Sequence, residues 1–182
     1  MRWIPLTITA YLLVLCQATL AKAITFSGLA IGPVGPDLLA IAVVFVALVV
    51  ADITDAMIAG WIFGLCLDLA AYGGPGLPTV IGPMSIAYAL GAAGIFSIRG
   101  AFFRDRSGPQ VVIALIFCVF SHLLWVTLQY LRSGGLAGGY GRMVLQVFAI
   151  SAYTAVLMPF GYRMLGRVRN WLFVPVAGRP RR

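Results

Sequence analysis

Few residues of this chain could take part in chemistry, and Asp68 is the most unusual of them. It ends an apolar run in which Ala56, Gly60, Gly64 and Asp68 follow one another at intervals of four residues. On a helix, this spacing forms one stripe of three small residues that leads to an acid. Small residues let a second helix approach closely in lipid, and an acid in such a segment needs a partner or a cavity. The stripe therefore predicts close helix packing, either within the chain or against another protein.

The only histidine, His122, is the second candidate. Its predicted helix carries other polar or aromatic residues on the same face: Cys118, Trp125 and Gln129. Measured from the inner ends of their helices, Asp68 and His122 lie about 20 Å and about 18 Å deep, and Gln146 lies at a similar level. We therefore leave three partners open for Asp68, namely His122, Gln146 or a second protein. His122 is either a hydrogen-bonded interior histidine or part of a proton relay with Asp68.

Known patterns of intramembrane catalysis do not fit the remaining residues. A rhomboid-type protease needs a serine in a Gly-x-Ser-Gly motif, and neither Ser85 nor Ser97 has this setting. Ser121 is adjacent to His122, so the two side chains point to different helix faces. An aspartyl protease needs two buried acids, and Asp68 is the only acid in mid-segment. We expect a protein that is not an enzyme and has no cofactor or metal site.

The composition indicates an integral membrane protein. Of the 182 residues, 62% are hydrophobic and only 10% are charged, whereas a soluble domain is about half apolar and about a quarter charged. The net charge is +8, and most basic residues flank apolar segments or lie in the C-terminal tail. This pattern is typical of loops that face anionic lipid. We therefore expect contact with membrane lipid and none with nucleic acid. The three cysteines form no C-x-x-C pair, which predicts free thiols.

Hydropathy and turn residues predict one all-α transmembrane domain over residues 1–182, with about six helices. The first apolar run ends in Ala21-Lys22-Ala23, which also fits a cleaved signal peptide, but we expect it to be retained. Asp37, after Pro36, is expected to cap the second helix, and Asp55 the third. The predicted spans are about 3–21, 37–51, 55–71, 79–98, 110–131 and 143–162, followed by a basic cytoplasmic tail at 163–182.

The distribution of basic residues predicts the orientation. With the N-terminus inside, ten of the 13 Lys and Arg residues fall in inner loops and tails, and three fall in outer loops. Cytoplasmic loops carry an excess of Lys and Arg. Both termini are therefore expected in the cytoplasm.

A family resemblance is carried by residues 36 to 100. Its motifs are Pro36-Asp37-Leu38-Leu39, Gly60-x-x-x-Gly64-Leu65-x-x-Asp68-Leu69, Gly74-Pro75-Gly76-Leu77 and Ala87-Tyr88-x-x-Gly91. This order resembles the bacterial rod shape-determining protein family MreD. The resemblance implies a fold like the substrate-binding subunit of energy-coupling-factor vitamin transporters, with a cavity open to the outer side. It also implies a non-enzymatic scaffold of the elongasome in the bacterial inner membrane, which supports lateral peptidoglycan synthesis and cell shape. Its partner would be MreC and, through it, MreB, the glycosyltransferase RodA and a class B penicillin-binding protein.

Two functions therefore remain open from the sequence. In the scaffold, helix packing or partner binding would fall to Pro36, Asp37, Gly60, Gly64, Asp68, Gly74, Gly76 and His122. The small-residue stripe would also allow a homo-oligomer. The alternative is a vitamin-type small-molecule binding subunit of a membrane transporter. Its ligand contacts would come from Tyr72, His122, Trp125 and Gln129.

Overall fold

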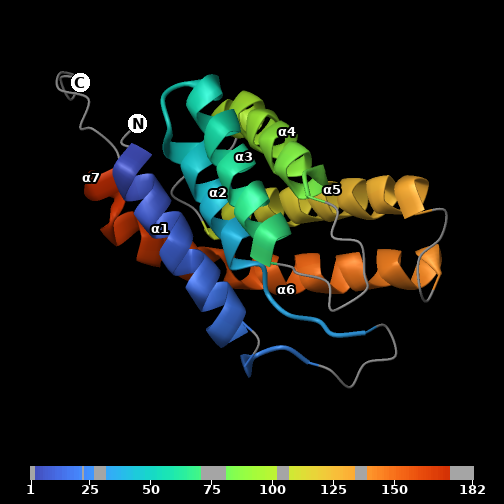
Figure 1. Cartoon of the computed structure of the whole chain (residues 1–182). Helices are drawn as coiled ribbons and strands as arrows, with labels where there is room; N and C mark the ends of the chain where they lie inside the picture. The colour runs from blue at the N-terminus through green and yellow to red at the C-terminus, as the bar shows by residue number, and fades with distance from the viewer. Residues whose placement is uncertain are drawn as a thin grey trace.

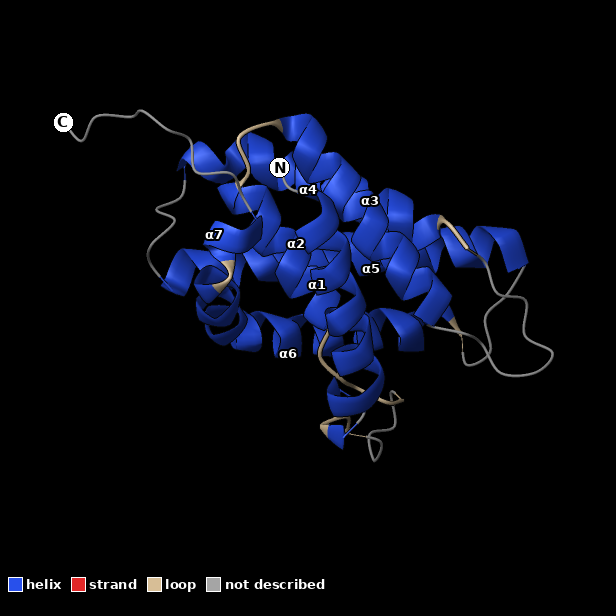
Figure 2. Ribbon diagram, turned by 60° about the vertical axis from the view of Figure 1, so that its left-hand side comes forward, coloured by secondary structure: helices blue, strands red, loops and turns tan. Residues whose placement is uncertain are grey.

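The regular structure of the chain is helical. The computed structural model describes residues 3–21, 23–26, 32–70, 81–101, 107–133 and 139–172. Across these ranges Figure 2 shows helices joined by loops, with no strand drawn. Within these ranges the one feature of β type is an isolated antiparallel bridge between Phe26 and Val34. The helices are α1 (Trp3–Cys16) with a π-helical continuation (Gln17–Ala21), α2 (Leu38–Val49), α3 (Ile53–Ala70), α4 (Pro83–Ile98) with a 3-10 turn (Arg99–Ala101), α5 (Ser107–Ser133), α6 (Tyr140–Arg167) and α7 (Arg169–Leu172).

The helices confirm an all-α membrane protein, although two of the expected spans are short. Within the described ranges, four segments are long and apolar enough to cross a membrane: Trp3–Leu20, Ile53–Ala70, Gly108–Leu131 and Tyr140–Arg167. By contrast, α2 has 12 residues and α4 has 16. Their lengths are about 18 Å and about 24 Å, against a hydrocarbon thickness of about 30 Å. Neither α2 nor α4 spans that thickness as a helix alone.

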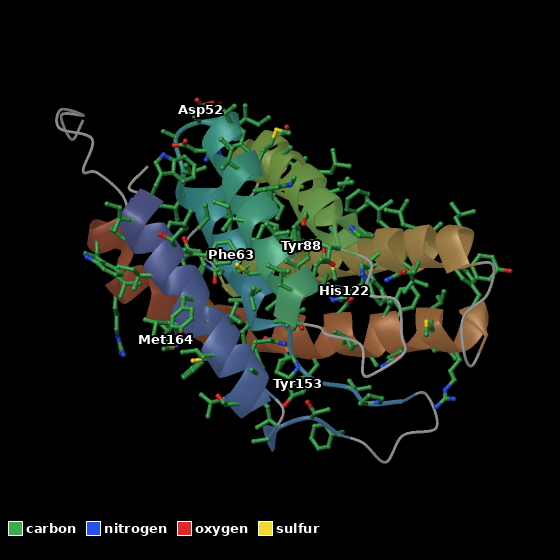
Figure 3. The ribbon with its side chains drawn as sticks, in the orientation of Figure 1. Asp52, Phe63, Tyr88, His122, Tyr153 and Met164 are labelled. Carbon is green, nitrogen blue, oxygen red and sulfur yellow. The ribbon has the colours of Figure 1, made fainter. Side chains whose placement is uncertain are left out.

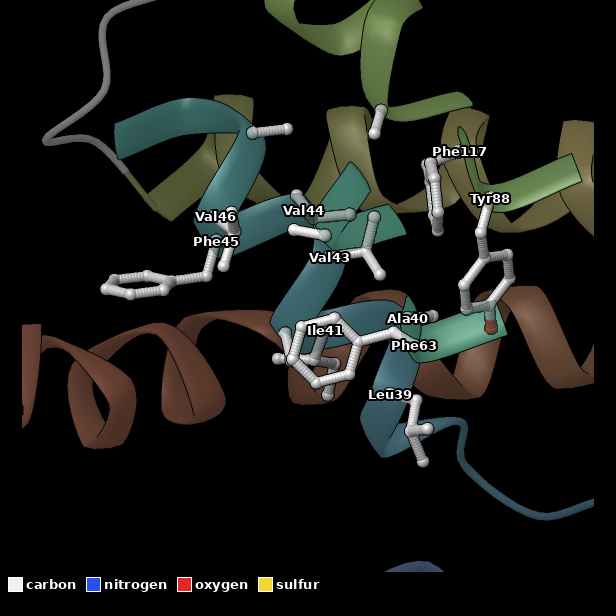
Figure 4. Packing of buried hydrophobic residues seen from close by; sticks show 14 of the residues in the cluster. Leu39, Ala40, Ile41, Val43, Val44, Phe45, Val46, Phe63, Tyr88 and Phe117 are labelled. Carbon is white, nitrogen blue, oxygen red and sulfur yellow. The ribbon is translucent and has the colours of Figure 1, made fainter. Parts of the chain in front are cut away.

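Helix α2 is the short central helix of the bundle rather than a lipid-facing span. It contacts α1, α3, α4, α5 and α6, and every residue from Leu39 to Leu48 is buried. A helix that is apolar on all sides requires such an enclosed position. Figure 4 shows α2 side chains, among them Leu39, Ile41 and Phe45, within this core. Helices α3 and α4 pack together on one side of α2, while α5 and α6 run side by side as a long antiparallel pair (Figure 1).

Polar groups close the turn between α2 and α3. The Arg99 guanidinium donates hydrogen bonds to the carbonyls of Ala47, at 3.4 Å, and Val50. A cation there also complements the partial negative charge of the C-terminal end of α2. At the start of α3, Oδ1 of Asp52 accepts a hydrogen bond from the Thr54 amide at 3.3 Å. Hydrogen bonds from Thr54 lower the pKa of the Asp52 carboxyl. The cap is therefore Asp52, and the expected cap Asp55 lies in the first turn of α3.

Candidate functional site

The small-residue stripe of α3 lies against the backbone of α4. A Cβ atom added to Gly60 would lie 2.6 Å from the carbonyl oxygen of Tyr88. One added to Gly64 would lie 2.5 Å from the carbonyl oxygen of Met84. Real Cβ atoms do not approach backbone so closely, so glycine at both positions is needed for this helix contact. The stripe is thus used within the chain.

Asp68, at the end of the stripe, binds the N-terminus of α4. Its Oδ2 accepts hydrogen bonds from the Gly82 amide at 2.9 Å and from the Ser85 amide and hydroxyl, both at 3.3 Å. The N-cap residue Gly82 has no side chain to perform this role, and the first amides of a helix need an acceptor. Asp68 lies near the C-terminal end of its own helix, where negative charge is unfavourable. The partial positive charge of the α4 N-terminus offsets that unfavourable interaction. Asp68 therefore receives these hydrogen bonds from α4 and not from His122 or Gln146.

The buried histidine is paired with Asp37 instead. Nε2 of His122 lies 3.3 Å from Oδ2 of Asp37, and the Tyr88 hydroxyl donates a hydrogen bond to the same oxygen. Asp37 also caps α2 as predicted, because its Oδ1 accepts from the Ala40 amide at 3.0 Å. Its own amide donates to the Thr154 hydroxyl at 2.9 Å. One carboxylate therefore joins α2 to α4 and α5, and Figure 3 shows Tyr88 and His122 in the same region of the bundle.

The hydrogen bonds of His122 determine how many protons the pair holds. Its Nδ1 lies 2.8 Å from the carbonyl oxygen of Cys118. A carbonyl only accepts, so Nδ1 must carry a hydrogen. One further proton between Nε2 and Oδ2 then gives either an imidazolium with a carboxylate or an imidazole with a carboxylic acid. Both states leave the Asp37–His122 pair neutral overall, which is how an acid and a base are accommodated in an apolar interior.

Two glutamines hold the segment that precedes α2. The Gln17 side chain donates to the Pro36 carbonyl at 3.0 Å and accepts from the Leu38 amide at 2.8 Å. From α6, the Gln146 amide group donates to the Pro33 carbonyl at 2.7 Å. These contacts satisfy backbone groups that no helix would satisfy. Sequence patterns did not single out Gln17, although it is the one amide side chain in the first apolar run.

A cavity of about 470 Å³ lies beside the start of α2. Asp37, which caps α2, and Pro36 just before it line this space. The cavity is lined from the π-helical continuation of α1, from α3, α4, α5 and α6, and from the segment before α2. Its polar and aromatic lining residues are Gln17, Thr25, Asp37, Asp68, His122, Trp125 and Gln146.

The predicted site residues therefore separate into three groups. Asp68, His122 and Gln146 do line one cavity, as their similar depth suggested, and Pro36, Asp37 and Trp125 line it too. Gly60 and Gly64 lie instead at the contact of α3 with α4, and Gln129 is not among the described residues that line the cavity. Gly74, Gly76 and Tyr72 lie outside the described residues.

Fold and site together define a helical membrane protein with a buried acid–histidine pair beside a cavity that is lined in part by polar side chains. Comparison with protein-family models, with curated proteins and with solved structures found no match.

Proposed function

We propose that this chain is a non-enzymatic scaffold subunit of the rod-shape machinery, of the MreD type. It would bind an MreC-like partner and, through that partner, act with MreB, RodA and a class B penicillin-binding protein in lateral peptidoglycan synthesis. The observation that supports this proposal is that residues of separate motifs meet in one place. Asp37 bonds to Tyr88, and Gly60 lies against the Tyr88 carbonyl. Gly91 lies against Phe117, whose ring centroid is 5.1 Å from that of Tyr88.

These residues hold helices together, and the two that carry reactive oxygens, Asp37 and Tyr88, are buried and hydrogen-bonded to each other, which favours a structural role over catalysis. The same contacts leave the stripe of α3 without room for a partner's helix. A partner's transmembrane segment would therefore lie on an outer face. Helix α6 offers one at Val156, Phe160 and Met164, which are 71%, 73% and 61% exposed and follow at intervals of four residues.

We further propose that the protein lies in the bacterial inner membrane with both termini in the cytoplasm. The support is that ten of the 13 Lys and Arg residues fall on the side expected to be cytoplasmic, where such residues are in excess. The start of α1 also packs near α7, so the first and the last of the described helices meet on one side of the bundle (Figure 1).

Site-specific photocrosslinking in cells tests the scaffold. A photoreactive amino acid replaces Val156 or Phe160 on the outer face of α6, with the buried Phe117 as the matched control position. We expect a crosslink to an MreC-like protein from the α6 positions and none from Phe117. If no MreC-like protein is captured and none co-purifies in mild detergent, while cells lacking the chain keep their rod shape, the scaffold proposal is wrong.

A second candidate function, a small-molecule binding subunit of a transporter, is favoured by one observation. The cavity, at about 470 Å³, falls within the size range of about 300 to 1,000 Å³ that is usual for ligand pockets. Mass spectrometry of the purified protein tests it. A small molecule recovered in stoichiometric amount would support this function, and recovery of detergent and phospholipid alone would count against it.

A further inference from the structure

We infer that the cavity beside α2 binds an organic cation with an apolar body. The inference rests on the second candidate function in one respect, which is that the cavity must accept a small molecule. It applies equally if the protein is a scaffold that senses such a molecule. It is carried by the charges of the cavity lining, by its aromatic residue and by its size.

Among the described residues that line the cavity, Asp68 carries a negative charge that the others do not fully neutralise. Asp37 and His122 neutralise each other through the proton that they share. Asp68 has the N-terminus of α4 as its compensation, which is equivalent to about half a unit charge. No lysine or arginine is among the described residues that line the cavity, and none of the described residues forms an ion pair with Asp68. A positive group of a ligand would supply the missing charge.

The walls suit the rest of such a ligand. Trp125 lines the same cavity, and a tryptophan face attracts a ligand cation through its quadrupole. The remaining wall is largely apolar, with Leu67, Met84, Val126, Val147 and Ile150. An anion would meet Asp68, and the described lining has no lysine or arginine to bind it. A neutral molecule would leave Asp68 with the partial compensation of the α4 N-terminus alone, about half a unit charge, whereas a cation would supply the remainder.

The test uses benzyltrimethylammonium as the probe and neopentylbenzene as its neutral isostere, in which a carbon replaces the charged nitrogen. Binding to the purified full-length chain in detergent is measured by titration calorimetry, with detergent alone as the blank. We expect the cation to bind one-to-one and at least tenfold more tightly than the isostere. Asp68→Asn should weaken cation binding at least tenfold and leave the isostere unaffected. Asp52→Asn, an exposed acid outside the cavity, should change neither.

The outcomes separate the cation inference from the wider binding function. If both probes bind equally, or if Asp68→Asn keeps full affinity for the cation, the cation inference is wrong while small-molecule binding stands. If neither probe binds one-to-one, the cation inference is overturned and the binding function loses its support. Should Asp68→Asn fail to fold, Trp125→Leu replaces it, and undiminished cation binding by that variant would overturn the inference.

Discussion

Nε2 of His122 lies 3.3 Å from Oδ2 of Asp37, and this contact ties the middle of α5 to the start of α2. The carboxylate reaches the histidine while its other oxygen caps α2. Both residues are buried. The position of the central helix along the bundle axis therefore depends on a polar pair and not on apolar packing alone, since apolar packing tolerates small shifts that a hydrogen bond does not.

Replacing Asp37 tests the importance of this pair. Asp37→Ala should lower the free energy of unfolding by about 3 to 5 kcal/mol, the usual cost of removing one partner of a buried ion pair. Asp37→Asn should cost much less. Its carbonyl oxygen still accepts from the Ala40 amide, and its amide group donates to Nε2 of a neutral His122. Thermal unfolding in detergent, followed by tryptophan fluorescence, gives the order of the two variants.

A double-mutant cycle separates the pair from the helix cap. If Asp37 and His122 act together, the losses from Asp37→Ala and His122→Ala add to clearly more than the loss in the double variant. Strict additivity would show that the contact between the two residues contributes nothing and that Asp37 acts only as a cap.

The glycines of α3 offer a second test with a matched control. Gly64→Ala should lower the free energy of unfolding by about 1 to 3 kcal/mol, because overpacking forces backbone or side chains to move. Gly94 on α4 has nothing within 4 Å of an added Cβ. Gly94→Ala should therefore be neutral or stabilise by about 0.5 to 1 kcal/mol, as alanine is the better helix former. Equal melting temperatures for the two variants would contradict the close contact of α3 with α4.

Sequence patterns predicted the helices well where composition decides the structure. Residues 37–51 were expected to form a helix, and the structure has α2 at Leu38–Val49 within that range. Pro36 and Asp37 marked the start of α2. The fourth helix was expected from about residue 79, but α4 begins at Pro83, because proline suits the first position of a helix. The role of α2 as a membrane span was predicted less accurately. An apolar run of this length fits a short core helix as well as a membrane span.

The partners of the polar side chains could not be predicted in the same way. Depth along a helix places Asp68 and His122 at one level, but it does not fix the rotation of each helix or which helices are neighbours. Asp68 binds backbone amides of α4, and such acceptor sites leave no mark on side-chain composition. Asp37 lies at a helix start, so its cap role was evident, whereas its contact with His122 depends on how α5 packs against α2.

The proposed orientation can be tested with single cysteines. Phe26 is 63% exposed and lies on the side expected to face outward, while Thr54 is exposed in the first turn of α3. In a variant without the three native cysteines, Phe26→Cys should react with a membrane-impermeant maleimide in intact spheroplasts. Thr54→Cys should react only after the membrane is permeabilised. The reverse pattern would place both termini outside and contradict the positive-inside assignment.

Replacing Asp68 separates its structural role from its charge. Asp68→Ala should lower the free energy of unfolding by about 1 to 2 kcal/mol, the upper range for loss of a helix cap, because the Gly82 and Ser85 amides lose their acceptor. Asp68→Asn keeps an acceptor oxygen and should melt close to the native protein. If both variants are equally destabilised, the negative charge itself holds the α4 N-terminus. If neither is destabilised, these hydrogen bonds do not stabilise the fold, since water or neighbouring groups then replace the carboxylate at no cost.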